Sequence, residues 1–209
     1  MRDWHEMPAE LPALTVADLS GWTRWLEKHH AQSNGVWLTL AKKGASEPTR
    51  LSYDDALVEA LCYGWIDGRL SGGDDRTFRR VFTPRRPGSA WSKRNVTIAT
   101  MLIEEGRMRR SGLAAVSRAK ADGTWDAAYH GQATIEVPPD LAAALARDPS
   151  AKAMFDKLSA SNRYSILYRV TTAKRPHTRR RRIEQFAAML ARGDTIYPQK
   201  DTAPHRKHD

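Results

Sequence analysis

Residues 65–95 read WIDGRLSGGDDRTFRRVFTPRRPGSAWSKRN, and this stretch decides the fold of the N-terminal half of the chain. Two runs suited to strands, 65–70 and 77–83, flank a turn rich in glycine and aspartate, which is typical of an antiparallel hairpin. A proline-bounded loop then leads into a helix that begins near Ser92. The stretch therefore predicts a hairpin followed directly by a helix.

The second strand of this hairpin mixes arginine with apolar side chains on both of its faces. Alternation places Phe78, Arg80 and Phe82 on one face and Thr77, Arg79 and Val81 on the other. An arginine among apolar groups needs an acidic partner inside the fold. We therefore expect Asp67, on the first strand, to pair with Arg79 or Arg80.

The segments on either side of the hairpin extend the prediction to an α+β domain over residues 14–135. Apolar spacing predicts a helix that Thr15 or Asp18 caps and that runs to about His30, and a second helix that Ser52 caps and that ends at Gly64. A strand is expected between them at 36–42. Two more helices are expected after the hairpin, at 92–105 and 111–121. The fold class is thus a small antiparallel sheet packed with helices, and residues 1–13 form a flexible lead-in.

A helical C-terminal module is expected over residues 136–195, after the Pro138-Pro139 pair. The last helix has an apolar stripe of Ile183, Phe186 and Leu190, with Thr178 as its predicted N-cap. Its other helices are expected at 141–147, 151–158 and 163–173, after a short extended piece at 133–137. Residues 196–209 form a second flexible tail.

The charge of the chain is unevenly distributed. The 209 residues contain 34 Lys and Arg against 24 Asp and Glu, a net charge of +10. Residues 1–78 hold 8 basic and 12 acidic residues, whereas residues 79–209 hold 26 and 12. A basic half of this kind favours a polyanionic partner, such as nucleic acid or an anionic membrane surface. The alternative is an arginine-rich protein whose charges simply face solvent.

Several classes of protein do not fit the composition. No apolar run approaches the roughly 20 residues that cross a bilayer, and the N-terminus has early acids and no apolar core. We therefore expect a cytoplasmic protein without a membrane span. The single cysteine, Cys62, excludes an internal disulfide and sits in an apolar run, where a buried, inert thiol is expected.

Motifs across most of the chain resemble the YdeI/OmpD-associated, or bacteriocin-protection, family. They are Trp65-Ile66-Asp67-Gly68, Phe82-Thr83-Pro84-Arg85, Ser89-Ala90-Trp91-Ser92, Asn95, Gly106-Arg107-Met108, Gly112, Ala173-Lys174 and Thr178-Arg179-Arg180-Arg181-Arg182-Ile183. The resemblance runs from about residue 35 to residue 193. It implies the YjbR/CyaY-like (frataxin-like) superfamily, an α+β core and a link to bacteriocin or antimicrobial-peptide resistance. It also implies a periplasmic location, from which this chain departs because no export signal is seen.

A first candidate site is an anion pocket in the hairpin and the following loop. Two arginines before a helix N-terminus attract anions, and nearby tryptophans offer stacking faces. The candidate ligand-binding residues are Trp65, Asp67, Arg79, Arg85, Arg86, Ser89, Trp91, Ser92 and Asn95. The alternative is a structural corner in which Asp67 pairs with an arginine, Ser92 is only an N-cap and Trp91 belongs to the core.

A second candidate site is a basic run near the C-terminus. The candidate nucleic-acid contacts are Lys174, Arg175, Arg179, Arg180, Arg181 and Arg182. Two helices joined by a short link resemble a helix–turn–helix in length, and cations in a first helical turn oppose the macrodipole unless an anion lies nearby. By helical spacing, Arg179 and Arg182 lie nearer the apolar stripe, whereas Arg180 and Arg181 point outward. The alternative is that Glu184 and other acids of the fold supply the anion.

No metal-ligand spacing, Gly-rich phosphate loop or catalytic combination appears, so we expect no metal, cofactor or catalytic residue. The sequence predicts a non-enzymatic binding protein that recognises an anionic partner, with a link to bacteriocin resistance or stress. One alternative is a nucleic-acid-binding protein that uses the C-terminal arginine-rich helix. Another is an enzyme or small-anion sensor that uses a Trp65/Arg85/Trp91 pocket. The sequence leaves the partner's identity and the oligomeric state open.

Overall fold

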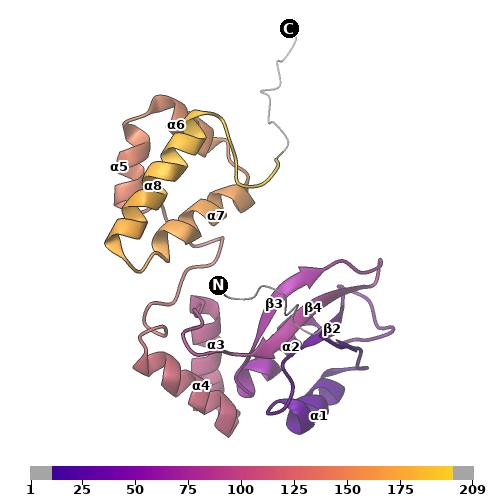
Figure 1. Ribbon diagram of the computed structural model, residues 1–209. Coiled ribbons are helices and arrows are strands. Elements are labelled where there is room, and N and C mark those ends of the chain that lie inside the picture. Colours follow the sequence, from indigo (N-terminus) through magenta and orange to yellow (C-terminus); the bar gives the residue numbers. More distant parts are fainter. Residues whose placement is uncertain (1–10, 200–209) are drawn as a thin grey trace, which may run out of the picture. The chain divides into compact units, whose positions relative to one another are not determined.

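The computed structural model describes residues 11–199, and the chain divides into two compact units after Ala128. The first unit combines a sheet with helices and the second is helical (Figure 1). The predicted α+β class is thereby confirmed. The flexible tails predicted at 1–13 and 196–209 lie mostly outside the described residues, although Tyr197 and Gln199 both hydrogen-bond to Asn162.

The first unit holds a four-stranded sheet in the order β1-β2-β4-β3. The strands are β1 (Ala13–Leu14), β2 (Val36–Ala41), β3 (Trp65–Ser71) and β4 (Thr77–Pro84). The β3–β4 hairpin is antiparallel as predicted, with a register shift between Asp67 and Leu70. The edge strand β1 pairs parallel with β2 and was not predicted, because a strand of two residues shows no alternating pattern.

Four helices accompany this sheet. They are α1 (Leu19–His29), α2 (Tyr53–Cys62), α3 (Lys93–Glu104) and α4 (Arg110–Ala121). The side chains of Asp18, Ser52 and Ser92 accept hydrogen bonds from backbone N–H groups at the starts of α1, α2 and α3, as N-caps do. Ser52 and Ser92 were predicted as caps from the sequence, and Asp18 was one of two candidates beside Thr15.

An aromatic core joins the helices to the sheet. Trp22 of α1 and Phe82 of β4 are both 0% exposed, and their ring centroids lie 5.6 Å apart. The Trp22 indole also donates a hydrogen bond to the carbonyl oxygen of Ala56 in α2. Cys62, at the end of α2, is buried as expected, and this burial raises the pKa of its thiol to about 11.

The second unit is a bundle of four helices. They are α5 (Pro139–Ala146), α6 (Pro149–Asp156), α7 (Ala160–Thr171) and α8 (Pro176–Ala191). Leu141, Phe155, Ile166 and Leu190 form part of its buried core. The predicted extended piece at 133–137 is not a strand. No helix within residues 11–199 is long and apolar enough to cross a membrane.

The start of α8 corrects one prediction. The helix begins at Pro176 with Arg175 at the N-cap, rather than after Thr178. Proline favours the first helical position because its φ angle is already helical and the N–H that it lacks would be unpaired there. The arginine run therefore begins at the fourth residue of the helix, beyond its first three positions.

Candidate functional site

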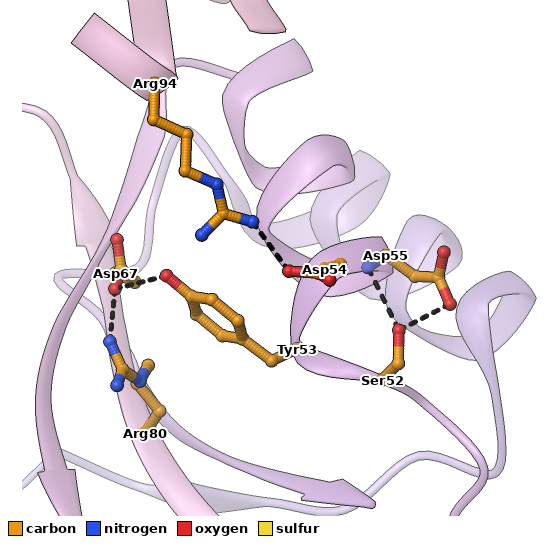
Figure 2. Close-up of polar contacts among 7 residues, drawn as sticks. All are labelled: Ser52, Tyr53, Asp54, Asp55, Asp67, Arg80 and Arg94. Atoms are coloured by element: carbon orange, nitrogen blue, oxygen red, sulfur yellow. Dashed lines mark hydrogen bonds and ion pairs between the residues drawn. The ribbon is translucent and has the colours of Figure 1, made fainter. Parts of the chain in front are cut away.

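A cluster of charged and aromatic side chains lies where β3 and β4 meet α2 and α3 (Figure 2). Arg80 forms an ion pair with Asp67, and the Tyr53 hydroxyl donates a hydrogen bond of 2.9 Å to the same carboxylate oxygen. The Asp67 and Arg80 side chains are only 16% and 24% exposed. The predicted pairing of Asp67 with a strand arginine is thus confirmed with Arg80 as the partner, while Arg79 is exposed.

Tyr53 lies close to two guanidinium groups in this cluster. The Cζ atoms of Arg80 and Arg94 are 4.6 and 5.7 Å from the centroid of its ring. Burial, followed by the neighbouring Asp67 carboxylate, raises the pKa of Tyr53 to about 12. The phenol therefore stays neutral and donates a hydrogen bond at physiological pH, which does not suit it to act as a general base.

Arg94, at the start of α3, completes the cluster by forming an ion pair of 2.7 Å with Asp54 of α2. This pair is exposed, at 54% and 75%, whereas the Asp67–Arg80 pair is not. Two arginines thus face two aspartates, and the cluster holds the hairpin, α2 and α3 together. Tyr53 was not predicted as part of this cluster, although it continues the buried stripe of Ala56 and Leu57 at helical spacing.

The structure brings together only part of the predicted anion pocket. Trp65 and Trp91 are 1% and 2% exposed, and the Trp65 indole donates a hydrogen bond to the carbonyl oxygen of His30. The guanidinium of Arg85 lies 3.8 Å from the centroid of the Trp91 ring and donates to the carbonyl oxygen of Ala90. These three side chains are buried in the first unit, where they form ring contacts and hydrogen bonds with other residues of the fold.

The predicted site residues at the start of α3 also form hydrogen bonds within the fold. Ser92 caps the helix by accepting a hydrogen bond from the backbone N–H of Asn95. A cavity of about 10 Å³ lies beside this corner, lined in part by Arg85, Arg86, Ser89 and Trp91, and this is roughly the volume of one water molecule. Trp65, Asp67, Arg79, Ser92 and Asn95 do not line it. Ligand binding by this set remains a prediction, and the packing does not favour it.

The basic run near the C-terminus divides into two groups. Arg179 makes two hydrogen bonds to the Asp140 carboxylate, at 2.6 and 2.8 Å, and a third to the carbonyl oxygen of Val170. These contacts tie α8 to α5 and α7, and the hydrogen bonds from Arg179 lower the pKa of Asp140. Arg182 likewise donates to the carbonyl oxygen of Arg169 in α7. Both arginines therefore have structural roles.

The other four cations face solvent, and we call Lys174, Arg175, Arg180 and Arg181 the basic surface. All four are exposed, and within residues 11–199 none of their side chains makes a hydrogen bond or ion pair. Glu184, four residues after Arg180, is exposed and pairs with none of them. The sequence suggested Glu184 or another acid of the fold as the anion near the run, and the acid found there is Asp140, which forms an ion pair with Arg179.

The start of α8 adds hydrogen-bond donors to the basic surface. No side chain caps this helix within the described residues, so the backbone N–H groups of His177 and Thr178 have no helical partner. Because the arginines follow the first three positions, the opposition to the macrodipole that the sequence suggested is small. Of the four arginines in the run, Arg179 and Arg182 have acceptors within the fold.

Nothing in the described part of the chain suggests a metal centre, since no three His, Cys, Asp or Glu side chains gather in a way that could hold an ion.

Comparisons with known proteins divide the chain much as the structure does. Residues 14–115 match a domain of unknown function (DUF8412), and residues 134–193 match the family described as Bacteriocin-protection, YdeI or OmpD-Associated. No curated protein and no solved structure matches the chain. The resemblance to this family is thus confirmed over residues 134–193, which contain α5 to α8, while the superfamily it implied stays a prediction. The bundle that carries the basic surface is similar to the YdeI/OmpD-associated, bacteriocin-protection family.

Proposed function

We propose that this chain is a non-enzymatic binding protein that contacts a polyanion, the phosphate backbone of nucleic acid, through the basic surface. The proposal rests on the observation that the basic run contains two kinds of cation, those bound to acceptors of the fold and those exposed to solvent. Arg179 and Arg182 are held by acceptors of the fold, whereas the four cations of the basic surface are exposed and have no partner among residues 11–199. Four free cations within eight residues form a local positive field that a phosphate chain can neutralise.

The charge of the whole second unit supports the same proposal. Residues 129–209 contain 15 basic and 8 acidic residues, a net charge of +7. Exposed arginines and lysines bind phosphates with little sequence preference, and the free N–H groups at the start of α8 can donate to phosphate oxygens as well. Binding of this kind has a Kd of about 1 μM or weaker at physiological salt.

The similarity to a bacteriocin-protection family favours a role in resistance, and the charge of the surface restricts how that role would work. Antimicrobial peptides are commonly rich in lysine and arginine, so the basic surface would repel them. A protective role for this protein therefore involves an anionic partner rather than direct capture of a cationic peptide by this surface. We place this activity in the cytoplasm.

Replacing Arg180 and Arg181 together with glutamate is expected to weaken oligonucleotide binding at least about tenfold, because two phosphate contacts become repulsive. The measurement is fluorescence anisotropy with labelled single-stranded and duplex oligonucleotides from low to moderate salt. Arg147→Glu/Lys157→Glu is the matched control, since both residues are exposed and the change in net charge is the same. This control should keep most of the affinity.

Two outcomes would count against the proposal. Absence of binding at low salt would reject it, and so would an equal loss of affinity in both double variants, which would indicate net charge alone. Vesicles containing anionic lipid serve as a further probe. Strong vesicle binding without oligonucleotide binding would assign the basic surface to a membrane instead.

A further inference from the structure

Two tyrosines occupy the face of α7 that points away from the core of the bundle. The buried residues of this helix are Asn162, Ile166, Leu167 and Val170. At 3.6 residues per turn, Tyr164 and Tyr168 fall on the opposite side, one turn apart. An outward-facing pair of aromatic side chains contributes nothing to the core of this unit, so its presence calls for another explanation.

The rings form a continuous aromatic surface. The Tyr164 and Tyr168 centroids lie 5.8 Å apart with the planes tilted by 37°, and the Tyr129 ring meets Tyr168 edge-on at 4.9 Å. Both α7 tyrosines are half-exposed. Neither hydroxyl hydrogen-bonds to a described residue, and neither is among the buried atoms that lack a partner. The hydroxyls therefore reach solvent.

The basic surface begins shortly after this aromatic surface along the chain. Tyr168 lies in the last turn of α7, which ends at Thr171, and Lys174 and Arg175 follow. Five residues lie between Tyr168 and Lys174, so the two Cα atoms are at most about 20 Å apart. Arg169, next to Tyr168, is also exposed, and its side chain has no hydrogen bond or ion pair within residues 11–199. Cations thus follow the tyrosine pair closely along the chain.

From this arrangement we infer that the natural ligand of the second unit is a single-stranded nucleic acid, whose bases stack on Tyr164 and Tyr168 while its phosphates contact the basic surface. The inference rests on the function proposed above. Single strands expose the faces of their bases, whereas a duplex buries them in its own stack. A positive surface alone does not favour the single strand, and the stacking face of the two tyrosines is what would select it.

The test compares two double variants with the wild-type chain. Tyr164→Ala/Tyr168→Ala removes both rings, whereas Tyr164→Phe/Tyr168→Phe keeps them and removes only the hydroxyls. We expect the alanine variant to bind a labelled single strand at least about fivefold more weakly, because each stacked base contributes substantially to affinity. Duplex binding should change by less than about twofold, since it depends on phosphate contacts. The phenylalanine variant should behave like the wild type with both probes.

The outcomes separate the inference from the function on which it rests. If the wild-type chain binds neither probe, the proposed function fails. If it binds both equally and the alanine variant is unchanged, the basic surface acts alone and the inference is overturned. If the alanine variant loses affinity for both probes to the same extent and its far-ultraviolet circular dichroism spectrum changes, the tyrosines only support the fold and the inference is overturned. The inference is supported if the alanine variant loses affinity for the single strand only, while the phenylalanine variant keeps the wild-type affinity.

Discussion

Replacing Asp67 with alanine is expected to destabilise the first unit by about 3 kcal/mol. The change leaves the Arg80 guanidinium, whose side chain is 24% exposed, without its ion-pair partner. It also removes the acceptor of the Tyr53 hydroxyl. A largely buried charge without a partner costs several kcal/mol, and an unpaired hydroxyl adds to that cost.

Tryptophan fluorescence during urea unfolding measures this effect selectively, because all seven tryptophans lie within residues 1–128. Asp54→Ala is the matched control, since its pair with Arg94 is exposed, and it should change stability by less than about 1 kcal/mol. Adding Arg80→Met to Asp67→Ala should restore part of the loss by removing the unpaired charge. An unfolding midpoint like that of the wild type in Asp67→Ala would contradict the structural role of the cluster.

Replacing Gly112 with alanine is expected to destabilise the same unit by about 2–3 kcal/mol. A Cβ atom at this position of α4 would lie 2.2 Å from the carbonyl oxygen of Cys62 and 2.9 Å from its carbonyl carbon. Both are backbone atoms at the end of α2, and a hydrogen bond from Arg109 to the same oxygen holds the two segments together. Alanine would therefore force α4 away from α2 and expose part of the core.

The intrinsic preference of helices for alanine offsets only about 1 kcal/mol of that loss. Gly72→Ala is the matched control, since no atom lies within 4 Å of a Cβ built there. Its unfolding midpoint should stay close to that of the wild type, while Gly112→Ala unfolds at a lower urea concentration. Equal midpoints for the two variants would show that α4 can shift without cost.

Local patterns were enough to predict most of the first unit. The hairpin, the N-caps Ser52 and Ser92 and the pairing of Asp67 with a strand arginine all follow from short-range rules about turns, caps and strand faces. The choice of Arg80 over Arg79 depends on which strand face the helices cover, and that is a tertiary property. Arg94 pairs with Asp54 across 40 positions, so no local pattern could identify it.

The C-terminal site shows the same limit. Spacing on α8 separated Arg180 and Arg181 from Arg179 and Arg182. However, Asp140, the acid that engages Arg179, lies 39 positions away. The start of the helix was misplaced because Thr178 and Pro176 compete as signals, and the cap preference was chosen over the preference for proline at the first helical position. The aromatic face of α7 was missed because its spacing resembles that of a core stripe.

The salt dependence of single-strand binding tests the central claim most directly. Four phosphate contacts through the basic surface predict that log K falls against log salt concentration with a slope of about −3. Arg180→Gln/Arg181→Gln removes two contacts without adding repulsion, so its slope should be shallower by about 1.4. A wild-type slope near zero, or an unchanged slope in this variant, would contradict the assignment of the basic surface to phosphate binding.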